Sequence, residues 1–380
     1  MKSINIYGAL LAAPLMFAAC SSDSNDVPAP VEEFEGIVLN IPNPNLSTRA
    51  IEDDEKAINS LVVLAYPSGN PSSTPQVFDL EDITSLSTNA YTQVPVRLKN
   101  GTYHIYVLAN LSSDKLSSNT AWESLTESAL QGATLSLNPA NISSGNLPMT
   151  CNYKAIRQTP TQGNTPGTVF TNGEVTITPK STTHVYADLT YAVAKVRYTM
   201  LNGKTPGLSM NEEAPIKVLN YATVESAMTY KEDLNVSSQL ADATITNGNY
   251  YACPEYTGVP EDSAVDNLDG DKGETSWAYQ GIVYVPERLF QATDTDDNKT
   301  KLHFIFNDNA YNEKSAFAFG GNTTVTGAQT GEASIVKNGI IRGTYYDIMA
   351  YTESKTVSIQ VRVKPWGYFK NVQDLNEFED

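Results

Sequence analysis

Several short stretches of the chain alternate between apolar and polar residues, a pattern that predicts β-strands with one buried face. In residues 33–41, EFEGIVLNI, one face of the expected strand is apolar and consists of Ile37, Leu39 and Ile41. Pro42 follows at once and should end this strand, because proline cannot donate a backbone hydrogen bond. The folded part of the chain is therefore expected to begin with a strand.

The same reasoning predicts many further strands and few helices. Residues 58–66, INSLVVLAY, are apolar almost throughout, which predicts a strand buried on both faces. Residues 114–131 carry apolar residues at loose helical spacing and predict short helices, whereas the Pro, Gly, Asn and Thr content of residues 145–173 favours a loop. The other expected strands are 91–98, 101–111, 182–201, 214–224, 280–290, 301–307, 344–351 and 356–366.

Short strands separated by turn-rich segments, with few helices between them, are typical of β-sandwiches. A chain of 380 residues is long enough for two sizeable cores, and a long apolar unit begins at residue 182. We therefore expect an N-terminal β-sandwich domain of residues 50–181 and a C-terminal β-sandwich domain of residues 182–380.

The C-terminal segment is apolar in an unusual place. Residues 356–364, TVSIQVRVK, alternate cleanly, and Pro365 then interrupts the strand. The segment beyond it, WGYFKNVQDLNEFED, alternates imperfectly, but its apolar side chains must be buried somewhere. Two interpretations stay open: the segment closes its own domain, or it enters another subunit. The apolar residues concerned are Trp366, Tyr368, Phe369, Val372, Leu375 and Phe378.

Residues 1–20, MKSINIYGALLAAPLMFAAC, have the pattern of a secretory signal. They start with the basic Lys2, continue with an apolar run too short for a membrane span, and end in small residues before Cys20. The ending MFAAC resembles a bacterial lipobox, in which the cysteine becomes the lipid-modified first residue; the alternative is a buried cysteine near an ordinary cleavage site. Acylated Cys20 would anchor the chain firmly, because several acyl chains together bind a membrane far more tightly than one.

Arg49 is the first basic residue after Lys2, since no Lys or Arg occurs between Ser3 and Thr48. Such a gap can arise by chance, because Lys and Arg together number only 25 in 380 residues. The interpretation we favour is a proteolytic site between Arg49 and Ala50, in a loop that the prolines of PNPN keep out of a sheet. Cleavage there would remove residues 21–49, an acidic, Ser- and Pro-rich tether followed by the leader strand of residues 33–41.

Charge and motifs exclude some functions. The net charge of −18 argues against nucleic-acid binding, because contacts with phosphates need a basic face. The chain has no GxSxG, Walker or HExxH motif, and its three histidines, His104, His184 and His303, lie in strand-like stretches. We therefore expect neither an enzyme nor a bound cofactor.

No metal site is expected either. Cys151 and Cys253 lack the spacing of metal ligands, and two separate, partly buried thiols are favoured over a disulfide between them. Residues 266–274, DNLDGDKGE, have oxygen-bearing residues at alternate positions like a calcium loop. They lack the glutamate that such a loop needs at its twelfth position, so a solvated acidic loop is the favoured interpretation.

Four features make the chain similar to the Bacteroidetes fimbrillins, the major and minor subunits of type V pili. They are the lipobox with its Arg-ended leader, GTYHIYVLANL at 101–111, DLTYAVAKVRYTM at 188–200 and PWGYFKNVQDL at 365–375. Their order gives the resemblance its weight, and together they extend over nearly the whole chain. The resemblance implies an all-β chain with two tandem transthyretin-like β-sandwich domains and minor short helices.

The resemblance also implies a function. The chain would be exported as a lipoprotein to the outer-membrane surface and cut by an extracellular, Arg-specific, trypsin-like protease, which maps onto Arg49 and Ala50. Loss of the leader strand would open a groove, and the C-terminal segment of another copy or a related pilus subunit would fill it, giving a fimbria that serves adhesion. The implied donor residues are Trp366, Tyr368, Phe369, Val372 and Leu375.

Two other classes of function remain open. One is a tip or accessory adhesin of the same pilus, which need not donate its C-terminal segment. The other is a surface glycan-binding lipoprotein, which would display exposed tryptophans; here there are only Trp122, Trp277 and Trp366. The sequence does not indicate which host or bacterial surface ligand an adhesin of this kind would bind.

Overall fold

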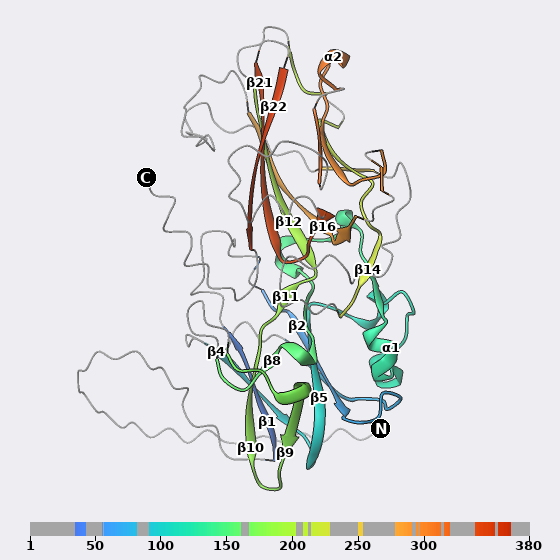
Figure 1. Cartoon of the computed structure of the whole chain (residues 1–380), viewed down its shortest axis with the longest axis vertical. Coiled ribbons are helices and arrows are strands. Elements are labelled where there is room, and N and C mark those ends of the chain that lie inside the picture. Colours follow the sequence, from blue (N-terminus) through green and yellow to red (C-terminus); the bar gives the residue numbers. More distant parts are fainter. Residues whose placement is uncertain are drawn as a thin grey trace, which may run out of the picture.

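Most regular elements in the computed structural model are β-strands, and its helices are only three to five residues long, so the described part of the chain is all-β, as the alternation predicts (Figure 1). No helix in the described part is long and apolar enough to cross a membrane. The structure describes residues 35–42, 55, 57–81, 91–160, 167–202, 208–211, 214–228, 250–253, 278–290, 294–295, 297–312, 315–319, 339–353 and 356–365.

The N-terminal half is a sandwich-like pair of sheets around one core. One sheet has the strand order β4-β1-β10-β8, and the other has the order β11-β7-β5-β2-β3, with β9 also paired to β5. Apolar side chains of both sheets form a single buried cluster, to which β1, β4 and β10 contribute from the first sheet and β2 and β5 from the second. The strands are β1 (Gly36–Pro42), β2 (Ser60–Pro67), β3 (Gln76–Glu81), β4 (Tyr91–Arg97), β5 (Gly101–Ala109), β7 (Met149–Cys151), β8 (Ile156–Arg157), β9 (Glu174–Ile177), β10 (Thr182–Ala187) and β11 (Thr190–Tyr191).

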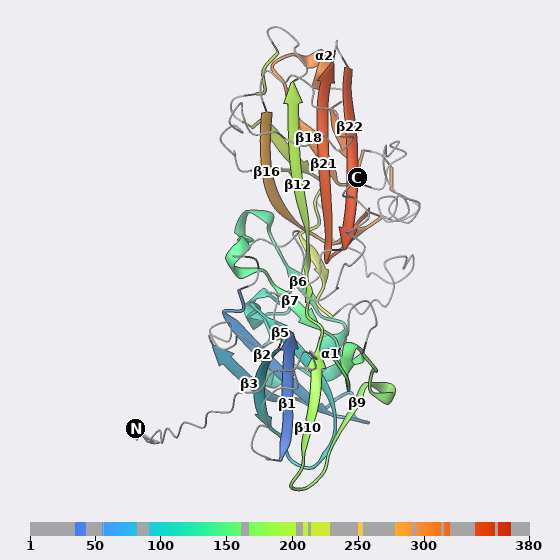
Figure 2. The same ribbon diagram turned by 90° about the vertical axis from the view of Figure 1, so that its left-hand side faces the viewer.

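The C-terminal half repeats this plan around a second core. Its sheets have the orders β16-β12-β21-β22 and β15-β13-β18-β19, and both contribute to a second buried cluster. Figure 2 shows the two halves following one another along the long axis of the molecule. The strands are β12 (Val193–Asn202), β13 (Ile216–Leu219), β15 (Tyr250–Ala252), β16 (Ala278–Pro286), β18 (Lys301–Phe304), β19 (Ala316–Ala318), β21 (Thr344–Glu353) and β22 (Thr356–Pro365).

Two small sheets and several short helices complete the described chain. The pair β6–β14 joins the two halves, because β6 comes from the first and β14 from the second. The expected short helices in residues 114–131 are present as η3, η4 and α1. The elements are β6 (Thr134–Ser136), β14 (Val224–Ser226), β17 (Arg288–Leu289), β20 (Gly339–Ile340), η3 (Ser113–Lys115), η4 (Trp122–Ser124), η5 (Pro139–Asn141), η6 (Ser144–Asn146), η7 (Tyr153–Ala155), η8 (Thr171–Gly173), α1 (Glu127–Gln131) and α2 (Asn309–Asn312).

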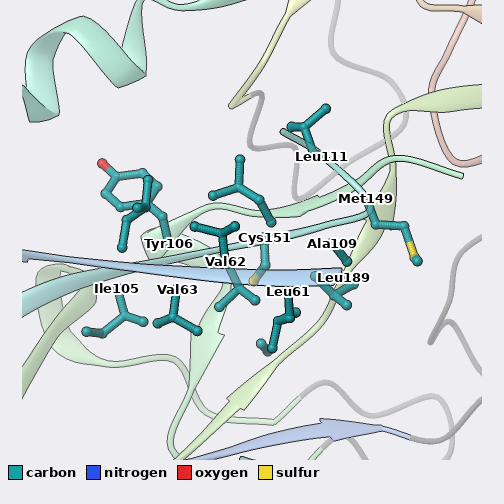
Figure 3. Packing of buried hydrophobic residues seen from close by; sticks show 14 of the residues in the cluster. Leu61, Val62, Val63, Ile105, Tyr106, Ala109, Leu111, Met149, Cys151 and Leu189 are labelled. Carbon is teal, nitrogen blue, oxygen red and sulfur yellow. The ribbon is translucent and has the colours of Figure 1, made fainter. Parts of the chain in front are cut away.

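The strand expected to be buried on both faces is an inner strand of the second sheet. β2 lies between β3 and β5, and six consecutive residues, Leu61 to Tyr66, are buried. Figure 3 shows Leu61 and Val63 on one side of this sheet, together with Ile105 of β5, and Val62 on the other side. Because neither face meets water, an unbroken apolar run is compatible with a strand here.

The division between the domains lies further along the chain than residue 181. β10 and β11 follow that position, yet they pair with strands of the first half. Along β11 and β12, the buried apolar side chains up to Val193 belong to the first core, and the next ones, from Ala194 to Met200, belong to the second. The expected unit 182–201 is therefore three strands, and the last of them, β12, carries the chain from one core into the other.

The loop expected over residues 145–173 is only partly a loop. β7 lies within it and pairs with both β5 and β11, and β8 pairs with β10. These strands are three and two residues long, too short to show an alternation of their own. The expected C-terminal strand is present as β22, which runs as far as Pro365 and buries Val361.

Candidate functional site

The predicted leader strand occupies the inside of a sheet. β1 pairs antiparallel with β4 along its whole length and parallel with β10 from Gly36 to Asn40. Figure 2 shows β1 and β10 side by side in the lower half of the molecule. β1 lies between β4 and β10 in this sheet, and these two strands do not pair with each other. Loss of β1 would therefore divide the sheet into β4 and the pair β10–β8.

All of the predicted leader-strand side chains are buried. Ile37 and Leu39 have no exposed surface, Ile41 is 1% exposed, and all three belong to the first core. Val38, on the opposite face, has no exposed surface either. Burial of four such aliphatic side chains corresponds to roughly 10 kcal/mol of gross hydrophobic stabilisation. The slot that β1 fills is therefore strongly apolar, which the alternation alone predicts for only one face.

A buried asparagine ties β1 to both of its neighbours. The Asn40 side chain has no exposed surface, and its Nδ2 donates to the carbonyl of Val185 in β10 at 3.0 Å. Its Oδ1 accepts from Nε2 of Gln93 in β4 at 3.1 Å. A single side-chain amide thus links β10 and β4, the two strands that form the walls of the slot. Such bonds are expected, since a buried polar group needs hydrogen-bond partners. Sequence reasoning placed Asn40 on the second face of the strand but had no signal for these partners.

The chain just after the expected cleavage site is fixed to the junction between the two halves. Glu55 is fully buried, and its carboxylate lies 2.7 Å from Nζ of Lys195 on β12. Tyr284 of β16 donates to the same carboxylate at 2.6 Å, and Tyr191 donates to the Glu55 backbone carbonyl at 2.9 Å. Residues that come from both halves therefore hold Glu55, six positions beyond Arg49.

A second polar anchor lies a few residues further on. Asn110, at the end of β5, adopts a positive φ of 54°, a conformation that asparagine tolerates better than most residues. Its side chain accepts from the backbone N–H of Asn59 at 2.7 Å and donates to the carbonyl of Ala57 at 2.7 Å. The segment that precedes β2 is therefore held independently of β1, and its attachment does not depend on the leader strand.

The Glu55–Lys195 pair gives a stability prediction. Lys195→Met should lower the unfolding free energy by about 3–5 kcal/mol, because it leaves a carboxylate buried without its cation. Differential scanning calorimetry of the uncut chain would show this as a lower unfolding temperature. Lys99→Met, at an exposed lysine, is the matched control and should change stability by no more than about 0.5 kcal/mol. An unfolding temperature for Lys195→Met equal to that of Lys99→Met would contradict the prediction.

The other chemistry-bearing residues have structural partners. His104 lies 2.6 Å from the buried carboxylate of Glu127, which also accepts from the hydroxyl of Tyr106 at 2.9 Å. His303 lies 3.0 Å from the carbonyl of Asn312, and burial lowers its pKa. Within the described residues there is no group of three or more His, Cys, Asp or Glu that could hold a metal ion.

The two remaining cysteines are free and lie in different cores, which agrees with the expectation of separate thiols. They are buried more completely than expected, with Cys151 1% and Cys253 5% exposed, and this burial raises the pKa of both thiols. Trp122, the one tryptophan in the described part of the chain, is 6% exposed and so offers no open platform for a sugar ring.

Several predicted positions lie outside the described residues. Cys20 falls in residues 1–34, Arg49 and Ala50 fall in residues 43–54, and the acidic loop of residues 266–274 falls in residues 254–277. The expected donor residues, Trp366, Tyr368, Phe369, Val372 and Leu375, lie beyond Pro365 in residues 366–380. Of the predicted site, the structure therefore describes the leader strand and the walls of its slot.

Comparison with models of protein families shows the family to which this chain belongs. A family model described as major fimbrial subunit protein (FimA) matches residues 45–267. The chain belongs to the major fimbrial subunit protein (FimA) family. Membership implies a component of a cell-surface fimbria that assembles with other pilus subunits, and it is a family of structural and adhesin-like proteins rather than enzymes. A comparison with curated proteins gives no match.

Several solved structures of fimbrial proteins and adhesins are similar to this FimA-family chain. The tip fimbrial protein Mfa3 from Porphyromonas gingivalis, solved with a C-terminal truncation, is 14% identical with a TM-score of 0.48, over 87% of this chain and 99% of that one. A fimbrial assembly protein from Parabacteroides distasonis is 12% identical with a TM-score of 0.47, over 87% and 99% of the two chains. A putative adhesin from Bacteroides thetaiotaomicron is 10% identical with a TM-score of 0.48, over 90% and 99%.

Proposed function

We propose that this chain is a polymerising subunit of a cell-surface fimbria, exported as a lipoprotein, cut after Arg49 and assembled by exchange of strand β1. In this account the C-terminal segment of a neighbouring subunit replaces β1 between β4 and β10. The observation that carries the proposal is the position of β1: it is a fully buried inner strand, and the only covalent link between it and the rest of the fold passes through Arg49.

The physical consequence of a cut at Arg49 supports strand exchange. β1 would then be held by non-covalent contacts alone and could leave. Its departure would expose an apolar slot and leave unpaired backbone groups on β4 and β10. Exposed strand edges of this kind are unstable and readily pair with another strand. A new strand restores the backbone hydrogen bonds and refills the pockets with alternate side chains, as in donor-strand complementation.

The anchors after the cut support the same account. Glu55 and Asn110 hold the chain that follows Arg49, so the new N-terminus would stay attached while the leader departs. The C-terminal segment begins directly after β22, the edge strand of a sheet in the C-terminal half, and its apolar residues need a place to be buried. The slot of β1 is apolar too, so it would bury these residues.

Controlled proteolysis tests the proposal. Purified precursor should be monomeric, and limited digestion with trypsin should convert it into filaments visible by electron microscopy. N-terminal sequencing of the assembled material should give Ala50 as the first residue. Efficient cleavage at Arg49 with release of residues 21–49 but without any filament would overturn polymerisation as the function.

The expected lipid anchor is tested separately. Cys20→Ala should abolish acylation and move the precursor from the detergent phase to the aqueous phase in detergent phase separation, because the acyl chains supply the membrane affinity. Ser21→Ala is the matched control and should partition like the wild type. A Cys20→Ala protein that remains in the detergent phase would refute the assignment of Cys20 as the anchor.

A further inference from the structure

We propose that a side-chain amide sets the register of any strand in the β1 slot, and that Asn371 of a second copy of this chain replaces Asn40 there. This inference rests on the proposed function, because it assumes that the C-terminal segment of one copy enters the slot of another.

The two walls of the slot each offer one hydrogen-bonding group to the side chain of Asn40. Gln93 of β4 lies directly opposite Asn40 in the strand register and donates its side-chain N–H to Oδ1 of Asn40. The carbonyl of Val185 in β10 accepts from Nδ2 of Asn40. Departure of β1 would take this partner from both groups, and an incoming strand with an apolar residue at this position would bury the Val185 carbonyl again without a partner, which is costly. An incoming strand with an amide at this position satisfies both walls.

Register matters because one face of β1 packs into the core. A shift by one residue would turn the apolar side chains away from the core and bring the polar ones in. Ile37 and Ile41 mark the two ends of the core-facing row, and we call their places the outer core positions. A suitable donor strand therefore needs an amide at the place of Asn40 and apolar residues at both outer core positions.

The start of the C-terminal segment repeats this arrangement in the same chain direction. Residues 366–372, WGYFKNV, align with residues 35–41, EGIVLNI. In this alignment Asn371 falls at Asn40, and Tyr368 and Val372 fall at the outer core positions. Gly367 falls at Gly36, whose φ of 149° lies in a region that favours glycine.

The other amides of the segment do not fit. The segment contains Asn371, Gln373 and Asn376. Gln373 at the place of Asn40 would put Lys370 and Asp374 at the outer core positions, and Asn376 would put Gln373 and Glu377 there. In the opposite chain direction, none of the three amides places apolar residues at both outer core positions. The alignment through Asn371 is therefore the one that satisfies the amide and both ends of the core-facing row.

One position of this alignment is unfavourable. Lys370 falls at the place of Leu39, which has no exposed surface. The apolar stem of a lysine can cover part of that pocket, but its ammonium group needs a polar partner or water. The donor strand is thus a poorer match than the leader at this point, and Lys370→Leu should strengthen the interaction. This expected gain is specific to the proposed register.

The alignment also identifies the partner. The segment reproduces the glycine, the amide and the aliphatic end of the same chain's own leader, so the slot it fits is the slot of its own kind. The occupant is therefore the C-terminal segment of a second copy of this chain, as in a homopolymer. A subunit that only terminates a filament would have no need for this correspondence.

Filament dissociation tests the register. Full-length precursors would be assembled with trypsin, diluted, and followed for release of subunits by light scattering. Asn371→Leu and Gln93→Leu should each speed release by about tenfold or more, because each leaves a buried polar group without its partner. The double variant should release no faster than the faster single variant, since both changes remove the same contact.

Matched variants distinguish loss of the register contact from a general effect of substitutions in the C-terminal segment. Gln373→Leu and Asn376→Leu should release subunits at the wild-type rate, whereas Lys370→Leu should release them more slowly. Asn371→Leu tests the contact from the side of the donor strand even if Gln93→Leu fails to fold.

Two failures are distinguishable. If deletion of residues 366–380 prevents assembly but Asn371→Leu filaments dissociate like the wild type, the register is wrong and the proposed function stands. If filaments form without residues 366–380, the proposed function fails and the register fails with it.

Discussion

An Arg49→Ala precursor should remain a folded, soluble monomer under conditions in which trypsin-treated wild-type precursor assembles into filaments. The expected effect is complete loss of assembly, because β1 keeps its covalent link and stays in its slot. An incoming strand would have to displace four buried aliphatic side chains, which corresponds to roughly 10 kcal/mol of gross stabilisation. Size-exclusion chromatography and electron microscopy of the treated protein would measure the outcome.

The control for this prediction is a second basic residue that trypsin can recognise. Lys99 is exposed in the turn between β4 and β5, and Lys99→Ala should assemble like the wild type. Filaments formed by Arg49→Ala at wild-type yield would show that cleavage at Arg49 is not the trigger. So would a mature N-terminus other than Ala50 in assembled wild-type protein.

Deletion of residues 366–380 should leave the uncut monomer folded but prevent cleaved subunits from assembling. We expect the uncut monomer to fold without this segment, because β22 already pairs with β21 from Thr356 to Pro365. In a filament, by contrast, the segment would bury Trp366, Tyr368 and Val372 in a neighbour, and loss of a buried aromatic costs about 3–5 kcal/mol. The melting temperature of the uncut monomer and the filament yield after trypsin would be measured together.

A shorter deletion serves as the control here. Removal of residues 376–380 takes away the charged end but keeps the whole expected donor strand, so assembly should persist. A sharp fall in the melting temperature of the uncut monomer on deletion of residues 366–380 would place the segment in its own domain. The chain would then be better explained as a tip or accessory subunit, with some other segment as donor in any polymer it joins.

The leader strand could be predicted from the sequence, but its surroundings could not. The alternation of residues 33–41 and the proline that follows identify β1 and its core-facing residues, because these signals are local. Its pairing with β10 joins residues such as Leu39 and Val185, which are far apart in the sequence. Such a pairing depends on the tertiary fold, and the long apolar run from residue 182 concealed it within a unit assigned to the other domain.

The buried polar contacts could not be predicted from the sequence either. Glu55 lies among acidic residues, where a solvated side chain is the usual expectation, yet it is buried against Lys195 and Tyr284. Each partner is more than 100 positions away in the sequence. Asn40 alternates with apolar residues like any outward-facing polar residue, yet its side chain has no exposed surface and bonds to both neighbouring strands. Sequence patterns report which face is polar, but not whether that face meets water.

The most direct test of the account is the identity of the strand between β4 and β10 in an assembled filament. A cryo-electron microscopy map of trypsin-assembled filaments, at a resolution that shows side chains, would reveal it. We expect residues 366–372 of a neighbouring copy to lie there, with the Asn371 side chain between Gln93 and the Val185 carbonyl. A map in which Gly36–Pro42 of the same chain still fills the slot would contradict it.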